Sequence, residues 1–182
     1  LSVLELGDLP LMPPMRLSRG PRGELLWGEY GSPKTPRPVR LFVSRDEGES
    51  FQPVRVLDDV LHVHNVIWDE HEGHYWVLTG DFDPQPGFGR LSADLERFEW
   101  FVRGEQRFRA VEVFDLGDRL VYGTDTQLET NALLSLDKRT GRVERIRELG
   151  GSCIYACRFG GLYALSTSVE PSTVNETQHA DL

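Results

Sequence analysis

Short apolar runs separated by turn residues dominate the pattern of hydrophobic and polar positions along the chain. Runs such as GELLWGEY, VRLFVS, HVHNVIW and HYWVLTG are rich in Val, Leu, Tyr and Trp, and Gly, Asp or Pro interrupts the chain between them. Almost no stretch has the period of an amphipathic helix. Evenly spaced strands with turn signals between them predict an antiparallel all-β fold.

A longer repeat runs through these strands. Turns, apolar strands and small or polar ends recur in the same order, so that Trp27 is matched by Trp76, and Asp81 by Asp125. The spacing is roughly 40–50 residues with four strands in each unit, which is typical of a β-propeller. A β-sandwich or barrel, whose strands would lack the longer period, ranks second.

The segment SRDEGESF, residues 44–51, carries the most specific motif in the chain. It fits S-x-D-x-G-x-x-[WF] through Ser44, Asp46, Gly48 and Phe51. At a tight hairpin Asp46 can accept backbone N–H bonds, Gly48 can supply a positive φ, and Phe51 can pack beneath the turn. The motif resembles the Asp-box of sialidase-like, or BNR-repeat, β-propellers.

Two weaker copies of the motif follow in later repeats. SADLERFEW keeps Ser92, Asp94 and an aromatic residue without the glycine, and SLDKRTGRV keeps only Ser135 and Asp137. In the resembling families the Asp-box joins the third and fourth strands of a blade, on the face away from the active site. The resemblance therefore makes this motif a marker of the fold, and we assign it no catalytic role.

The resemblance also orders the strands of each blade from an inner to an outer position. We expect one propeller domain over residues 1–182, with blades at about 11–57, 61–103, 107–148 and 151–182, the last of them incomplete. Strands are expected at 62–68, 74–80, 87–91 and 97–103, then at 109–114, 119–124, 131–136 and 142–148, and finally at 152–158 and 161–167. Sialidase-like propellers close with six blades, so about three and a half blades predict a fragment of a longer propeller with an open sheet edge. Self-association of copies is the alternative way to cover that edge.

In such a propeller, two loops of every blade lie on the same face. One leads into the first strand of the blade, and the other follows its second strand. Polar residues in these loops predict a pocket at the mouth of the central channel. The candidate catalytic acids are Asp81, Asp125 and Glu170. The candidate substrate-binding residues are His62, His64, Arg109, Thr124 and Tyr155.

A pocket with several acids suits glycoside hydrolysis, which needs two carboxyl groups across the scissile bond, one of them protonated. The resemblance thus implies a glycoside hydrolase or lyase that acts on a glycan. A true sialidase is not expected, because Arg16 is a weak counterpart of the sialidase Arg-Ile-Pro motif and Arg109 stands for only one of three carboxylate-binding arginines. The alternative is a non-catalytic propeller that binds a glycan or a protein partner at the same face.

A metal site is a weaker alternative. His62 and His64 point the same way on a strand and Asp81 follows in an adjacent loop, a set that could bind Zn²⁺ or Fe²⁺. Such a His pair is more often hydrogen-bonded than metal-bound, and we expect no cofactor. His71 and His74 flank a turn on the opposite face, where we expect both to be solvated.

The excess of acidic residues argues against some classes of binding partner. A formal net charge of −9 argues against a nucleic-acid groove or an anionic membrane surface as the partner. Its apolar runs fall short of the ~20 residues needed to cross a bilayer, and the start LSVLELGDLP lacks signal-peptide features. We therefore expect a carbohydrate ligand, no nucleic-acid or membrane partner, and a cytoplasmic location.

Overall fold

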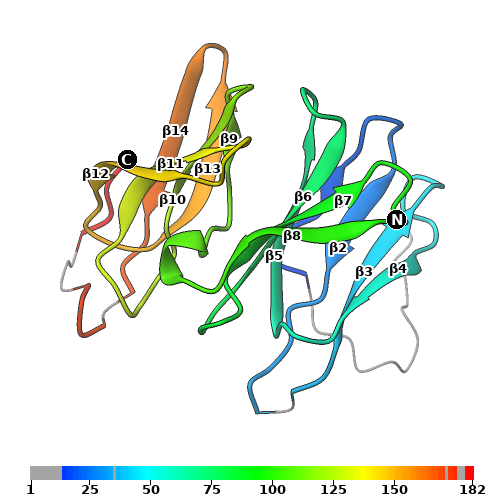
Figure 1. Cartoon of the computed structure of the whole chain (residues 1–182), viewed down its shortest axis with the longest axis horizontal. Coiled ribbons are helices and arrows are strands. Elements are labelled where there is room, and N and C mark those ends of the chain that lie inside the picture. Colours follow the sequence, from blue (N-terminus) through cyan, green and yellow to red (C-terminus); the bar gives the residue numbers. More distant parts are fainter. Residues whose placement is uncertain (1–13, 35, 171, 176–178) are drawn as a thin grey trace. The chain divides into compact units, whose positions relative to one another are not determined.

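The computed structural model describes residues 14–34, 36–170, 172–175 and 179–182, and this part of the chain is all-β (Figure 1). Its helical content is one 3₁₀ turn, η1 (Gln106–Phe108). None of the described residues belongs to a helix long and apolar enough to cross a membrane. The chain forms two compact units: the first runs up to Gly80 and includes Gly89–Trp100, and the second holds Asp81–Phe88 and Phe101–Leu182.

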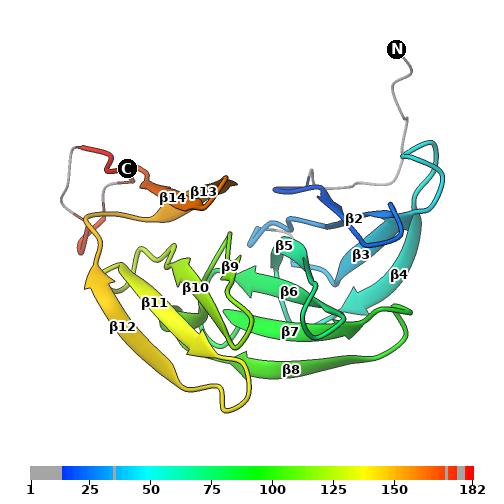
Figure 2. The ribbon, with the colours of Figure 1, turned by 90° about the horizontal axis from the view of Figure 1, so that it is seen from above.

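Three antiparallel sheets have four strands each, and the strands of each sheet lie in chain order (Figure 2). The first sheet contains β1 (Ser18–Arg19), β2 (Leu25–Gly28), β3 (Val39–Ser44) and β4 (Gln52–Leu57). The second contains β5 (His62–Asp69), β6 (His74–Gly80), β7 (Gly87–Ser92) and β8 (Phe98–Arg103). The third contains β9 (Phe114–Asp115), β10 (Arg119–Gly123), β11 (Ala132–Asp137) and β12 (Val143–Glu148). A two-stranded sheet follows, made of β13 (Cys153–Phe159) and β14 (Leu162–Thr167).

Most strands lie where the apolar runs place them, and the one clear exception is the strand expected at 109–114. There only Phe114–Asp115 forms a strand, and Ala110 makes an isolated bridge with Thr124. Arg109 caps the end of the 3₁₀ turn, and its N–H donates to Gln106 O at 2.9 Å. Because of this turn, the chain joins the sheet only at Phe114. The strand expected at 109–114 is therefore wrong in its extent.

Alternating apolar residues of the first two sheets form the core of the first unit. Its buried members are Leu26, Val39, Leu41, Val43, Leu57, Val60, Val63, Val66, Tyr75, Val77, Leu91 and Leu95. β2 and β5 approach each other closely at Gly28, where an added Cβ would lie 2.3 Å from the Val63 side chain. The close packing of these strands therefore requires glycine at this position.

The Asp-box segment forms the predicted hairpin between β3 and β4. The Ser50 N–H donates to Asp46 Oδ1 at 3.0 Å, and the Gly48 N–H donates to Ser44 Oγ at 2.8 Å. Gly48 has a positive φ of 93°. Phe51 makes an edge contact with Trp27, with 6.0 Å between ring centroids. The predicted capping role of Asp46 is confirmed.

The degenerate copy at 92–98 makes the same kind of turn without a glycine. The Arg97 N–H donates to Ser92 Oγ at 3.0 Å, and the Glu96 N–H donates to Asp94 Oδ1 at 3.1 Å. Leu95 takes a positive φ of 68°, a conformation that a β-carbon disfavours. The side-chain bonds of Ser92 and Asp94 are strong enough to hold the turn in spite of that cost.

Hydrogen bonds from Ser50, first from its hydroxyl and then from its N–H, lower the pKa of Asp46 to about 2, with a further contribution from Ser44. We predict that Ser50→Ala moves the pKa of Asp46 upward, toward its ordinary value of 3.8. A lowered folded-state pKa stabilises the fold above pH 3.8, and this contribution is lost as the pH falls toward 2. Carboxyl titration by NMR measures the pKa, and an unchanged Asp46 titration in the variant would contradict the assignment.

Candidate functional site

Three charged side chains meet inside the second unit, and all three are predicted site residues. Arg109 Nη2 lies 3.1 Å from Asp81 Oδ1 and 3.6 Å from Asp125 Oδ2, and Arg109 Nη1 donates to Asp81 O at 3.1 Å. Asp81 directly follows β6, Asp125 lies just after β10, and Arg109 caps the end of the 3₁₀ turn. All three residues are at least nine-tenths buried. We call Asp81, Arg109 and Asp125 the ion-pair cluster.

Gln106 extends the ion-pair cluster by a chain of hydrogen bonds. Its Nε2 donates to Asp81 O at 3.1 Å and to Asp83 Oδ1 at 2.8 Å. Its Oε1 accepts from the Thr126 hydroxyl at 2.7 Å. Gln106 is buried, so the amide holds the loops after β6 and β10 together. A single Gln in a polar segment carries no pattern, so the sequence does not single it out.

A second buried network fixes the loop after β10. The Thr124 hydroxyl donates to Asn131 Oδ1 at 2.9 Å, and Asn131 Nδ2 donates to Thr126 O at 2.8 Å. Asn175, far along the chain, also donates to Thr126 O at 2.9 Å. Thr124 was predicted to bind substrate, and in the structure its hydroxyl group stabilises the loop after β10.

A cavity of about 200 Å³ opens beside this network. Its polar lining includes Gln106, Thr124, Thr126 and Thr130, with the charged Arg107 and Glu129. Arg107 and Glu129 are exposed, whereas Gln106, Thr124 and Thr126 are buried and lie at its wall. We call this cavity the polar pocket.

The ion-pair cluster pairs two of the candidate catalytic acids, Asp81 and Asp125, with one arginine. Both carboxylates are within 4 Å of one guanidinium nitrogen, so their nearest oxygens lie at most about 7 Å apart, an upper limit that overlaps the separations of about 5–9.5 Å found in glycosidases. A facing arginine favours the ionised form of each carboxyl group, however, and hydrolysis needs one carboxylic acid that can give up a proton. The cluster as it stands ties loops together.

His62 and His64 lie in the first unit, where they pack with Tyr30. The ring centroids of Tyr30 and His62 are 3.9 Å apart, and those of Tyr30 and His64 are 6.1 Å apart. Both histidines are buried. The position of His64 also depends on Gly80, because a Cβ there would lie 2.3 Å from His64 Cε1.

Glu29 anchors a further buried charge network in the first unit. It is fully buried and accepts hydrogen bonds from Arg40 Nη2 at 2.7 Å and from Arg37 Nη2 at 3.2 Å. Burial alone would raise the pKa of Glu29, but the hydrogen bonds from Arg40 and Arg37 outweigh it, and the pKa lies below its ordinary value. This acid thus stays ionised inside the protein.

The remaining predicted residues are Tyr155 and Glu170, on and after the last two strands. Tyr155, on β13, is 60% exposed. Glu170 follows β14 and, among the described residues, makes no hydrogen bond or ion pair with the ion-pair cluster. A single pocket that unites His64 with Asp81, Arg109 and Asp125 stays a prediction.

A group of possible metal ligands lies at the turn between β5 and β6, not at the predicted pair His62 and His64. Among the described residues, Asp69, Glu72 and His74 form the one group of three whose ligand atoms all lie within 4.8 Å of one another. The side chain of His74 is only 13% exposed, so the expectation that it is solvated is wrong, while that of His71 is 48% exposed as expected. The ring of His74 packs on Trp76, which the sequence pattern alone could not show.

We predict that Arg109→Ala lowers the free energy of unfolding by about 3–5 kcal/mol, because it removes a positive charge from between two buried carboxylates. Denaturant unfolding measures the loss. The exposed Arg139→Ala is the matched control, and it should change stability by no more than about 0.5 kcal/mol. Equal stability of the Arg109 variant and the control would show that the ion-pair cluster does not hold the loops.

Gly80→Ala should destabilise the first unit by about 1–3 kcal/mol, because the new methyl group overlaps the His64 ring. In a His64→Ala background the same substitution should cost much less, since the overlapping ring is gone. A double-mutant cycle by chemical denaturation measures this coupling. Identical costs in both backgrounds would mean that the ring does not limit the space at Gly80.

No protein-family model matches the chain, and no curated protein is significantly similar to it. The residues of the chain are therefore the basis for assigning its function.

Proposed function

We propose that the chain is part of a β-propeller of the sialidase-like, BNR-repeat class, and that the polar pocket binds a carbohydrate without cleaving it. Two features support the propeller. Four-stranded antiparallel meanders follow one another along the chain, as blades do. The hairpins at Asp46 and Asp94 have the side-chain bonds that an Asp-box needs.

The observation that carries the binding proposal is the lining of the polar pocket. Its volume of about 200 Å³ is small for a drug-sized ligand and suits a single sugar ring. Hydroxyl, amide and charged groups line it together with the apolar Ala132, Leu134 and Val143, and a sugar presents hydroxyls that both donate and accept. Arg107 and Glu129 at its exposed rim offer one donor group and one acceptor group.

Binding without cleavage follows from the state of the nearby acids. Asp81 and Asp125 are buried and share Arg109, so neither is a protonated acid aimed at a ligand. Cleavage would require Arg109 to release at least one of them into a pocket. We infer that the ion-pair cluster supports the wall of the pocket and that the rim residues hold the ligand.

Saturation-transfer NMR with a panel of neutral and carboxylated monosaccharides tests this function. We expect a signal for at least one sugar and its loss in both Arg107→Ala and Glu129→Ala, because each variant removes a rim contact. The exposed Arg139→Ala is the control and should keep the signal. Absence of binding by the whole panel, or equal binding by all variants, would refute a sugar site at this pocket.

A parallel assay with chromogenic glycosides distinguishes binding from hydrolysis. We expect no turnover. Turnover that disappears in Asp125→Asn, with the folded fraction unchanged, would replace the binding function by hydrolysis at the ion-pair cluster.

A further inference from the structure

The turn between β5 and β6 is unusually rich in possible metal ligands. Its sequence is DEHEGH, residues 69–74, in which every position except Gly73 offers a carboxylate or an imidazole. Gly73 has a positive φ of 71°, and its N–H donates to Asp69 O at 3.0 Å. This tight turn places side chains from the two strand ends next to one another.

Three of these side chains converge with the spacing of a metal site. The ligand atoms of Asp69, Glu72 and His74 all lie within 4.8 Å of one another, and His74 Nδ1 is 3.8 Å from Glu72 Oε2. Two ligands of a tetrahedral zinc ion with bonds of about 2.1 Å lie roughly 3.4 Å apart. Rotation of the partly exposed Glu72 side chain can shorten its distance to His74 Nδ1.

The surroundings hold two of the three groups in place. Asp69 Oδ1 accepts from the N–H groups of His71 and Glu72, each at 2.9 Å, and Asp69 Oδ2 accepts from Trp76 Nε1 at 2.8 Å. The His74 ring packs edge-on against Trp76 with 4.6 Å between centroids. Such bonds and contacts around the ligands orient a metal site before the ion arrives.

We propose that Asp69, Glu72 and His74 bind a divalent transition-metal ion of the Zn²⁺ class, with water completing its coordination. One imidazole and two carboxylates form a donor set that Zn²⁺ accepts. The ion would link the end of β5 to the start of β6 and so clamp the hairpin. The site is independent of the sugar pocket, because all its residues belong to the first unit.

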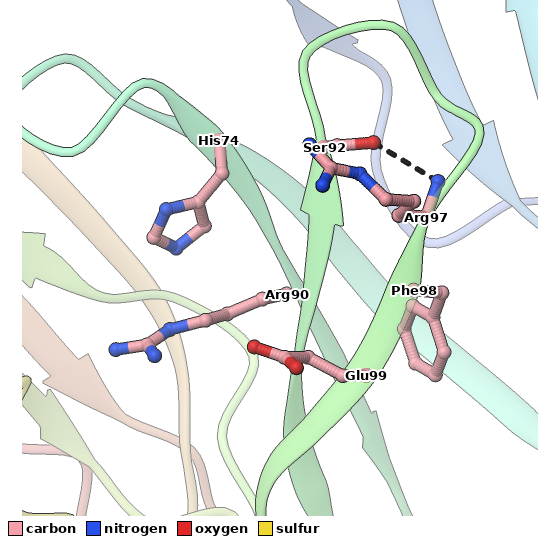
Figure 3. Close-up of a pocket in the computed structure, with 6 residues that line it drawn as sticks. All are labelled: His74, Arg90, Ser92, Arg97, Phe98 and Glu99. Atoms are coloured by element: carbon pink, nitrogen blue, oxygen red, sulfur yellow. Dashed lines mark hydrogen bonds between the residues drawn. The ribbon is translucent and has the colours of Figure 1, made fainter.

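Arg90 regulates access to the proposed site. Its Nη2 lies 3.6 Å from Glu72 Oε2, the same oxygen that faces His74 Nδ1, and its guanidinium lies 5.1 Å from the centre of the Trp76 ring. Figure 3 shows Arg90 and His74 among the residues that line a pocket, and the volume of this pocket is about 280 Å³. A bound cation must displace Arg90 from Glu72, and this pocket gives the guanidinium room to move.

Isothermal titration of the full chain, free of any His tag, with Zn²⁺ tests the site. We expect one ion per chain and a change in tryptophan fluorescence, because His74 packs on Trp76. His74→Ala should abolish the binding, and Glu72→Gln should weaken it by roughly 10-fold or more. Arg90→Gln should tighten it by roughly 3-fold to 10-fold, because a competing positive charge is removed.

His71→Ala is the matched control, since His71 lies in the same turn but outside the converging group. It should bind Zn²⁺ like the unmodified chain, and every variant should remain folded at the assay temperature without metal. Binding that is lost equally in the His71 and His74 variants would reveal adventitious surface coordination and overturn the proposal. No binding, or binding that survives His74→Ala, would also overturn it.

Discussion

A carboxylate that accepts backbone N–H bonds at a tight turn is the interaction on which the rest of this structure depends. Asp46, Asp69, Asp94 and Asp137 each receive such bonds at a hairpin between neighbouring strands. The sheets are meanders whose strands are at most eight residues long, so the turns must set their register. A slip by one residue would turn the buried face of a strand to solvent. The acids at the turns thus secure the apolar core as well as the hairpins.

Two groups of buried acids are stabilised by arginine side chains, whereas the acids at the turns accept bonds from backbone N–H groups. Removing a carboxylate from water costs several kcal/mol unless a partner compensates. Accordingly, the buried Glu29 lies between Arg37 and Arg40, and Arg109 lies between Asp81 and Asp125. These groups are suited to a scaffold, because their charges are already satisfied. A ligand can reach exposed charged side chains more easily, and these lie beside neutral polar groups that hydrogen bonds hold in place.

The two proposed sites each combine groups that hydrogen bonds hold in place with exposed groups that can move. At the polar pocket, buried amide and hydroxyl groups fix the wall, and exposed charges form the rim. At the β5–β6 turn, the buried Asp69 is fixed by N–H donors while Glu72 stays partly exposed and adjustable. In each case a rigid group is combined with a movable one. That combination lets a ligand bind without disturbing the core.

The sequence alone determined the strands and the Asp-box hairpin, because alternating apolar residues and turn chemistry act over a few neighbouring residues. β6 and the cap by Asp46 were therefore predictable. It also indicated that Asp81, Arg109 and Asp125 would meet, through their equivalent places in the repeats. Only the tertiary structure decided that these three are buried and paired, that Gln106 and Asn175 join loops far apart in the sequence, and that His74 is covered by Trp76. Burial and charge pairing depend on which loops come together, and that is fixed only when the whole chain has folded.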